Sequence, residues 1–99
     1  DRKARKRIEA EQRKQLLPLR RKVSAVEQDL ASLHARQTIL EKDLAEPELY
    51  REENKDRLKR VLLEKAEVDG QCEARETDWL ELSEQLEAMR ASIAPDPDE

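Results

Sequence analysis

Apolar residues recur along the chain at alternating steps of three and four positions. Gln37 interrupts the first series, and Lys65 and Arg75 interrupt the second. The first series is Leu16, Leu19, Val23, Val26, Leu30, Leu33, Gln37, Leu40 and Leu44, and the second is Leu58, Val61, Lys65, Val68, Cys72, Arg75, Trp79, Leu82, Leu86, Met89 and Ile93. This alternation is typical of coiled coils and is not produced by disordered chains. We therefore predict two long helices, each with one apolar seam.

The two series are separated by the segment AEPELYREE, residues 45–53. Pro47 has no backbone N–H and disfavours a helical conformation at Glu46, so the first helix should end there. We expect Leu49 and Tyr50 to cover the open end of the seam. Because so short a connection makes consecutive helices antiparallel neighbours, the predicted fold class is all-α, an antiparallel two-helix coiled-coil hairpin.

The predicted chain has three parts. Residues 1–14 are a basic N-terminal lead-in that is helical or partly ordered, and residues 15–93 form the antiparallel hairpin. Residues 94–99 form a disordered acidic tail. Within the hairpin, the first helix runs to about residue 45, the tip covers residues 45–54, and the second helix runs from about 54 to 93.

The seam residues also predict a register. When Leu40 faces Leu58, each helix contributes one of its seam residues to every layer, and Leu19 faces Trp79. In an antiparallel coiled coil, the a positions of the heptads in one helix face the d positions in the other, and this register satisfies that rule.

Pro18 falls inside the first apolar series, where a proline costs about 3 kcal/mol or more. We expect a kink at this point, with the indole of Trp79 filling the widened space. The alternative is a full break that separates residues 1–17 from the hairpin.

The composition excludes a compact globular core. Of the 99 residues, 44% are charged and 36% hydrophobic, with no Phe, one Trp, one Tyr and one Gly. Such a chain suits long helices that bury a narrow stripe. The single cysteine excludes an internal disulfide, and the chain has neither an apolar run of membrane-spanning length nor a signal-peptide core. We expect a cytoplasmic protein without membrane contact and, because it begins at Asp1 rather than Met, a piece of a larger protein.

No motif for catalysis is present. A phosphate-binding loop needs two glycines, and the chain has one. His34 has no His or Cys partner at metal-ligand spacing, and Cys72 occupies a seam position, where a buried, unreactive thiol is expected. We therefore predict that this chain is not an enzyme and holds no metal or cofactor of its own.

Positive charge is concentrated at the start of the chain. Residues 1–22 contain ten basic and three acidic residues, a net charge of +7, whereas the other 77 contain ten basic and twenty-one acidic residues, a net of −11. This asymmetry indicates an electrostatic partner, and a helix of this length spreads its charges over about 30 Å, within reach of several phosphates. The candidate nucleic-acid-binding residues are Arg2, Lys3, Arg5, Lys6, Arg7, Arg13 and Lys14 in the lead-in, with Arg51, Lys55 and Arg57 at the tip.

The opposite charges of the two halves also favour pairing within the chain. We expect Arg20, Arg21 and Lys22 to pair with acidic residues of the second helix, which leaves the first fourteen residues to bind. Those acidic residues are Glu73, Glu76, Asp78, Glu81, Glu84 and Glu87. Because Tyr50 and Trp79 are the only aromatic residues, no platform exists for stacking single-stranded bases, and contact should be with the backbone.

Three stretches carry a resemblance to a known family: LPLRRKVSAVEQDLASL, the Pro-x-x-Tyr of the tip, and DWLELSEQLE. Together they resemble the C-terminal coiled-coil domain of ABC-F ATPases of the Uup/YheS-like type, over about residues 3–92. The resemblance implies a parent protein with two ATP-binding cassettes that use ATP and magnesium, no transmembrane part, and action on the ribosome. It also implies that the hairpin is an arm that binds DNA or ribosomal RNA.

Two functions therefore remain open from the sequence. The first is a nucleic-acid-binding arm of an ABC-F ATPase linked to translation, with a monomeric hairpin. The alternative is a protein-interaction or dimerisation coiled coil without a nucleic-acid role, in which the seam pairs between chains.

Overall fold

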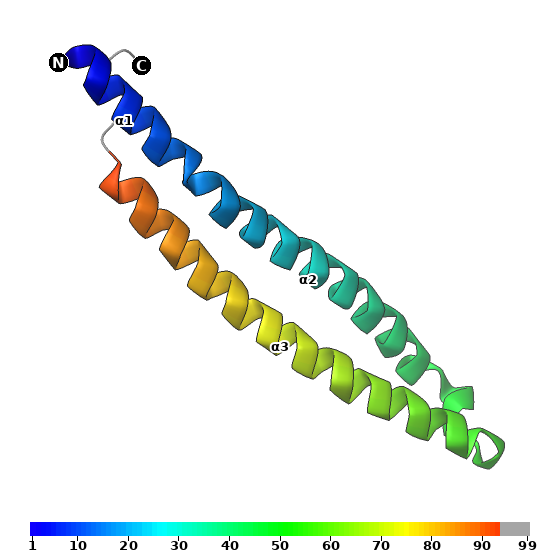
Figure 1. Cartoon of the computed structure of the whole chain (residues 1–99). Coiled ribbons are helices and arrows are strands. Elements are labelled where there is room, and N and C mark those ends of the chain that lie inside the picture. Colours follow the sequence, from blue (N-terminus) through cyan, green and yellow to red (C-terminus); the bar gives the residue numbers. More distant parts are fainter. Residues whose placement is uncertain (94–99) are drawn as a thin grey trace.

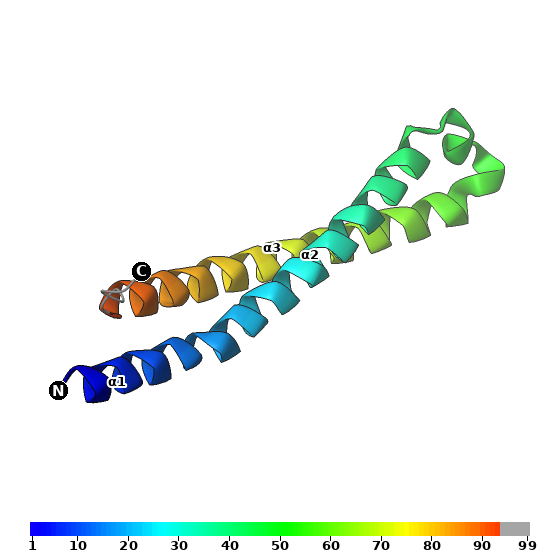
Figure 2. The same cartoon turned by 90° about the horizontal axis from the view of Figure 1, so that it is seen from above.

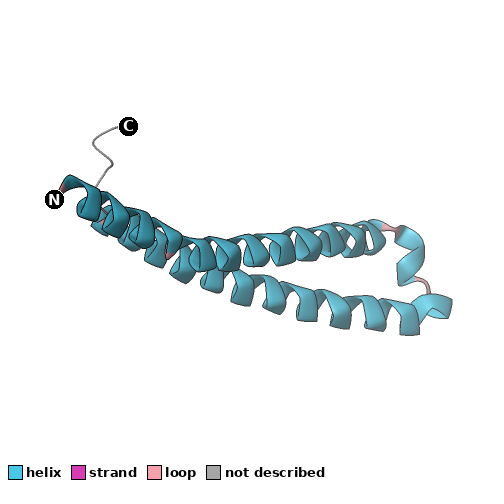
Figure 3. Cartoon of the chain, turned by 45° about the horizontal axis from the view of Figure 1, so that its top comes forward, coloured by secondary structure: helices cyan, strands magenta, loops and turns pink. Residues whose placement is uncertain are grey.

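The computed structural model describes residues 1–93, and the acidic tail predicted for residues 94–99 lies outside the described part. Three α-helices and two short 3-10 turns follow one another (Figure 1). They are α1 (Arg2–Lys14), α2 (Leu16–Ala45), η1 (Pro47–Tyr50), η2 (Glu52–Asn54) and α3 (Lys55–Ser92). Figure 3 shows that irregular backbone between helices is confined to short connections, chiefly at the tip.

The helices form a long antiparallel hairpin. In Figure 1, α3 runs back beside α2, so that the start of α1 and the end of α3 lie at the same end of the molecule. The molecule is 78 Å long and 19 by 15 Å across, and Figure 2 shows α2 crossing α3 about midway. The predicted all-α hairpin is confirmed. No helix within residues 1–93 is both long and apolar enough to cross a membrane.

The seam buries two separate apolar clusters. The cluster near the tip consists of Leu40, Leu49, Val61, Val68 and Cys72. The cluster near the open end consists of Leu16, Leu19 and Leu86, with Val23, Leu82, Met89 and Ile93 packed around it. All of these residues except Leu49 belong to the two predicted series, so the periodicity identified the core.

The predicted register is wrong by one heptad. Leu19 is buried together with Leu86, which lies seven residues beyond the predicted partner Trp79. Trp79 is instead 36% exposed. At the tip, Leu49 is buried in the cluster of Leu40, and Leu58, the predicted partner of Leu40, packs against this cluster while only partly buried.

The tip is built on three contacts. Leu49 is only 1% exposed and covers the end of the seam, as predicted. The ring of Tyr50 does not share this role, because it is mostly exposed while its hydroxyl donates a hydrogen bond of 2.6 Å to the Leu44 carbonyl. Asn54 Nδ2 donates to the Glu48 carbonyl at 2.8 Å, so this side chain ties the two 3-10 turns together.

Pro18 bends the helix without interrupting the chain's course. Proline lacks an N–H and its ring crowds the carbonyl four residues earlier, here that of Lys14. The interruption falls next to that carbonyl, at Gln15, which keeps a helical conformation (φ −66°, ψ −18°) and whose N–H bonds to the carbonyls of Glu11 and Gln12. The full break is therefore excluded, and α1 continues the direction of α2 (Figure 1).

Candidate nucleic-acid interface

The basic lead-in is a capped helix. The side chain of Asp1 accepts a hydrogen bond of 3.1 Å from the N–H of Lys3, which satisfies one of the free donors at the start of α1. Arg13 and Lys14 occupy the last turn, where positive charge is favoured by the helix dipole. The sequence therefore fixes the helix at both ends, and the basic side chains are held in a regular array.

Four cations of the lead-in have no carboxylate partner within residues 1–93. Lys3, Arg5, Arg7 and Lys14 are exposed, and none of them takes part in an ion pair with a described residue. Arg2 and Lys6, by contrast, each interact with another group. The four unpaired charges keep their full attraction for an external anion.

Arg13 is engaged within its own helix. Its Nη2 lies 4.0 Å from Oε2 of Glu9, a carboxylate that is only 6% exposed. Both atoms are buried without a hydrogen bond, so each charge compensates the other. Arg13 is therefore less available for binding than the four unpaired cations of the lead-in.

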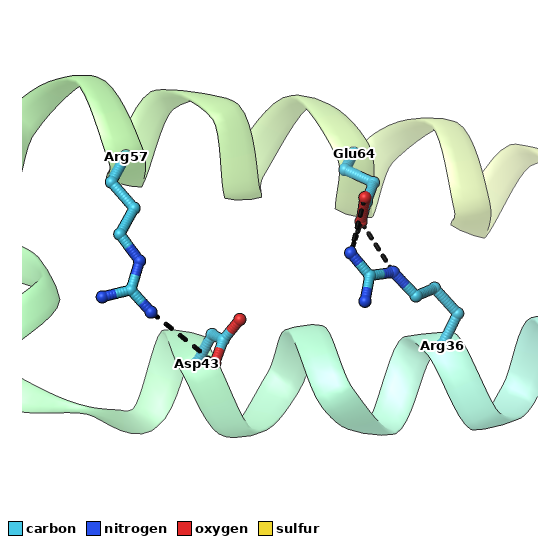
Figure 4. A network of polar contacts seen from close by, with 4 residues as sticks. All are labelled: Arg36, Asp43, Arg57 and Glu64. Carbon is cyan, nitrogen blue, oxygen red and sulfur yellow. Dashed lines mark hydrogen bonds and ion pairs between the residues drawn. The ribbon is translucent and has the colours of Figure 1, made fainter.

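The three predicted tip cations all lie close to carboxylates. Arg51 is 3.8 Å from Glu53, and Lys55 is 3.9 Å from Glu52. Arg57 of α3 reaches across to Asp43 of α2 at 4.0 Å (Figure 4). These exposed pairs are weak, but each places a negative charge beside the cation. The structure therefore does not bring the tip and the lead-in into one positive surface.

The expected pairing of Arg20, Arg21 and Lys22 with the second helix is wrong. All three are exposed, and none forms an ion pair within the described part of the chain. The carboxylates of α3 have other partners: Asp78 binds Arg75 at 2.6 Å, and Glu76 lies 3.8 Å from His34. Unpaired positive charge therefore extends beyond residue 14 into the start of α2.

The two charged seam residues are held by neighbours of their own helix. Lys65 Nζ donates to Asp69 at 2.7 Å, and Gln37 donates to the same carboxylate at 2.8 Å across the hairpin. Hydrogen bonding from Lys65 and Gln37 lowers the pKa of Asp69, and the bond to Asp69 raises the pKa of Lys65. The network of Lys65, Asp69 and Gln37 has a structural role, because it links α2 and α3 and its charged groups are bonded to one another.

The remaining candidate chemistry is sparse. Burial raises the pKa of the Cys72 thiol, which disfavours the reactive thiolate. No three His, Cys, Asp or Glu side chains within residues 1–93 are grouped to hold a metal ion. That the chain is not an enzyme stays a prediction.

Residues 17–84 match the family model described as the ABC transporter C-terminal domain, which is well over half of the chain. The chain belongs to this family. The resemblance seen in the sequence is thus confirmed at the level of a C-terminal domain of ABC-family ATPases. Neither the curated proteins nor the solved structures gave a match. The matched range begins after the lead-in, so the unpaired cations of α1 lie outside it.

Proposed function

We propose that this ABC transporter C-terminal domain is an arm of an ABC-F ATPase linked to translation, and that it contacts nucleic acid, DNA or ribosomal RNA, through its basic first helix. ATP and magnesium would belong to the cassettes of the parent protein. The single observation that carries the proposal is the row of exposed cations in α1, Lys3, Arg5, Arg7 and Lys14, without carboxylate partners among residues 1–93. The 78 Å hairpin gives such an arm its reach.

Electrostatics favours this helix over the rest of the molecule. Residues 1–22 carry +7 while the remainder carries −11, and the acidic later part of α3 runs back toward the same end of the hairpin, so an approaching polyanion is attracted to the side formed by α1 and repelled by the side formed by α3. Contact with phosphates releases condensed counterions, and the affinity must therefore fall steeply with salt.

The test is fluorescence anisotropy of labelled duplex DNA and duplex RNA titrated with the 99-residue chain at several salt concentrations. The test variant carries R2Q, K3Q, R5Q, K6Q and R7Q. Because glutamine forms helix about as well as lysine or arginine, the hairpin should persist, and circular dichroism verifies it. We expect the variant to lose at least about a hundredfold in affinity near 0.1 M salt, since the unpaired cations Lys3, Arg5 and Arg7 and their phosphate contacts are removed.

A charge-matched control separates a local interface from net charge. Lys42, Arg51, Lys55, Lys59 and Arg60 also lie on the exposed surface, but far from α1. Replacing these five by glutamine gives the same net charge and should change the affinity much less. An unchanged affinity in the α1 variant would refute the proposed interface.

A second candidate, a protein-interaction coiled coil, is favoured by one observation. Leu62 and Leu63 at the start of α3 are 51% and 64% exposed, an arrangement that a partner protein would cover. Self-association is less favoured, because the seam is already closed by α2 and α3 of one chain. Sedimentation equilibrium separates the cases: a mass that stays monomeric at micromolar concentration supports the arm, and a concentration-dependent dimer supports the alternative.

A further inference from the structure

Four exposed cations of α1 and the start of α2 point in one direction. Lys3, Arg7 and Lys14 belong to α1 and Arg21 to α2, at steps of four, seven and seven residues. In a helix of 3.6 residues per turn, a step of four overshoots one turn by about 40° and a step of seven falls about 20° short of two. The four side chains, which we name the outer cationic stripe, therefore stay within about 40° of one another.

The stripe faces away from α3. Leu16 is buried in the seam, and it lies nine residues from Arg7, which corresponds to about half a turn beyond two full turns. None of the four stripe residues forms an ion pair within residues 1–93. The stripe is thus an open surface on the side of the hairpin that the second helix does not cover.

The stripe is continuous across the joint between α1 and α2. Gln15 retains a helical conformation, so that α1 runs directly into α2 (Figure 1). Eighteen residues separate Lys3 from Arg21, which at 1.5 Å per residue gives a stripe of about 27 Å. A duplex presents roughly sixteen phosphate charges over that length, one per about 1.7 Å of its axis.

We propose that the outer cationic stripe binds the phosphate backbone of double-stranded nucleic acid, with Arg21 as part of the contact and the tip outside it. This inference rests on the proposed function and specifies its ligand and its residues. The complementarity is one of charge: a continuous row of unpaired cations about 27 Å long is matched to the dense phosphate charge that a duplex presents along its axis.

A single strand is a poorer ligand for this surface. Binding of single strands depends on aromatic side chains on which bases stack. The two aromatic residues lie elsewhere: Tyr50 is at the tip, where its hydroxyl is bonded to Leu44, and Trp79 is on α3. The stripe can therefore hold phosphates but offers no surface for bases.

The second helix orients the complex. Glu73, Glu81 and Glu84 of α3 are exposed carboxylates in the half of the hairpin that lies beside the start of α2. They repel phosphates and leave the outer side of α1 as the favourable approach. The duplex should consequently lie along one side of the hairpin rather than between the helices.

The experiment compares two variants with the same loss of charge. The stripe variant carries K3Q, R7Q, K14Q and R21Q, and the control carries K42Q, R51Q, K59Q and R60Q. Anisotropy is measured from about 50 to 200 mM salt on a duplex DNA and a duplex RNA of roughly 20 base pairs, longer than the stripe, and on the single strand. Circular dichroism confirms that both variants keep the helical content of the wild type.

The slope of log affinity against log salt is the decisive readout. For duplex DNA, we expect the slope of the stripe variant to be smaller in magnitude than that of the wild type by about three to four, the value for four lost phosphate contacts. The slope of the control should be smaller by less than about one. A larger loss of slope in the stripe variant than in the control, on either duplex, supports the stripe, and the comparison of the two duplexes identifies which nucleic acid supplies the phosphates. R21Q alone should reduce the slope by about one, which also keeps the test decisive if the fourfold variant loses helix.

Three outcomes would overturn the proposal, and they separate it from the function on which it rests. If wild type binds duplex and both variants lose equal slope, the stripe is wrong while the arm stands. If the single strand binds as tightly as the duplex, the assigned ligand is wrong. If the wild-type chain binds no nucleic acid even at low salt, both the stripe and the arm fail.

Discussion

Arg36 of α2 and Glu64 of α3 form a bidentate ion pair across the hairpin. Nε and Nη2 of the arginine donate to the carboxylate oxygens at 2.8 and 2.7 Å (Figure 4). Seven residues away on each helix, in opposite directions along the chain, Arg57 approaches Asp43 at 4.0 Å. The flanking charges therefore repeat with the same heptad period as the seam and support one antiparallel register.

The Arg36–Glu64 pair should make a small but measurable contribution to stability. Both side chains are nearly half exposed, so a double-mutant cycle of R36A and E64A in urea unfolding should give a coupling of about 0.5 kcal/mol that decreases with added salt. The longer Arg57–Asp43 contact provides the comparison and should couple more weakly. A coupling that is zero at low salt would remove the pair from the forces that hold the register.

The side chain that closes the tip should matter far more than any ion pair. Leu49 is 1% exposed in the cluster of Leu40, so L49A leaves a cavity and should lower the free energy of unfolding by about 2–4 kcal/mol. Leu62 is the matched control, since it is half exposed and L62A should change stability by less than about 0.5 kcal/mol. Equal effects of the two substitutions would mean that Leu49 does not close the seam.

How far the sequence predicts this fold is clearest at the seam and the tip. The three-four spacing identified the buried face, because only one stripe of a helix can meet a single partner helix. Pro47 identified the turn, because a residue without an N–H ends a helix. The register did not follow, since both Leu49 and Leu58 pack with Leu40 at the tip, and the spacing of leucines does not say which of them sets the pairing of the helices.

The sequence predicted the positive charge of the candidate interface but only part of its position on the molecule. Counting charges located the excess of cations in residues 1–22. It did not tell paired from unpaired cations, because a carboxylate can pair within its own helix, as Asp78 does with Arg75, and a count of charges does not show this. The seven-residue spacing of Arg7, Lys14 and Arg21 was the available signal for the stripe.

Replacement of the only glycine should stabilise the hairpin. Gly70 is exposed within α3, and a Cβ added there would meet no atom within 4 Å. Because alanine is favoured over glycine in a helix interior by about 1 kcal/mol, G70A should raise the free energy of unfolding by about that amount. Thermal and urea unfolding measure the change, and a destabilised G70A would indicate that α3 needs a bend at this position.

The Lys65–Asp69–Gln37 network predicts how stability depends on pH. The pKa of Asp69 is below its ordinary value of 3.8, chiefly through the hydrogen bond from Lys65, so the unfolded chain binds this proton more readily than the folded one. The stabilisation is complete above the unfolded pKa and is lost as the pH falls through the folded pKa. The pKa of Lys65 is raised above 10.5, so the stabilisation by Lys65 is complete below that value and is lost as the pH rises through the folded pKa.

D69N should therefore lower the urea midpoint relative to wild type near neutral pH, and the difference should shrink below about pH 4 as the wild-type carboxylate becomes protonated. The many other carboxylates titrate in the same range, so the difference between the two proteins is the informative quantity. D29N is the control, because Asp29 is exposed in the middle of α2 and forms no ion pair with a described residue. If the D69N difference stayed constant down to pH 2, the charge of Asp69 would contribute nothing, and the network would act only through the shape of its side chains.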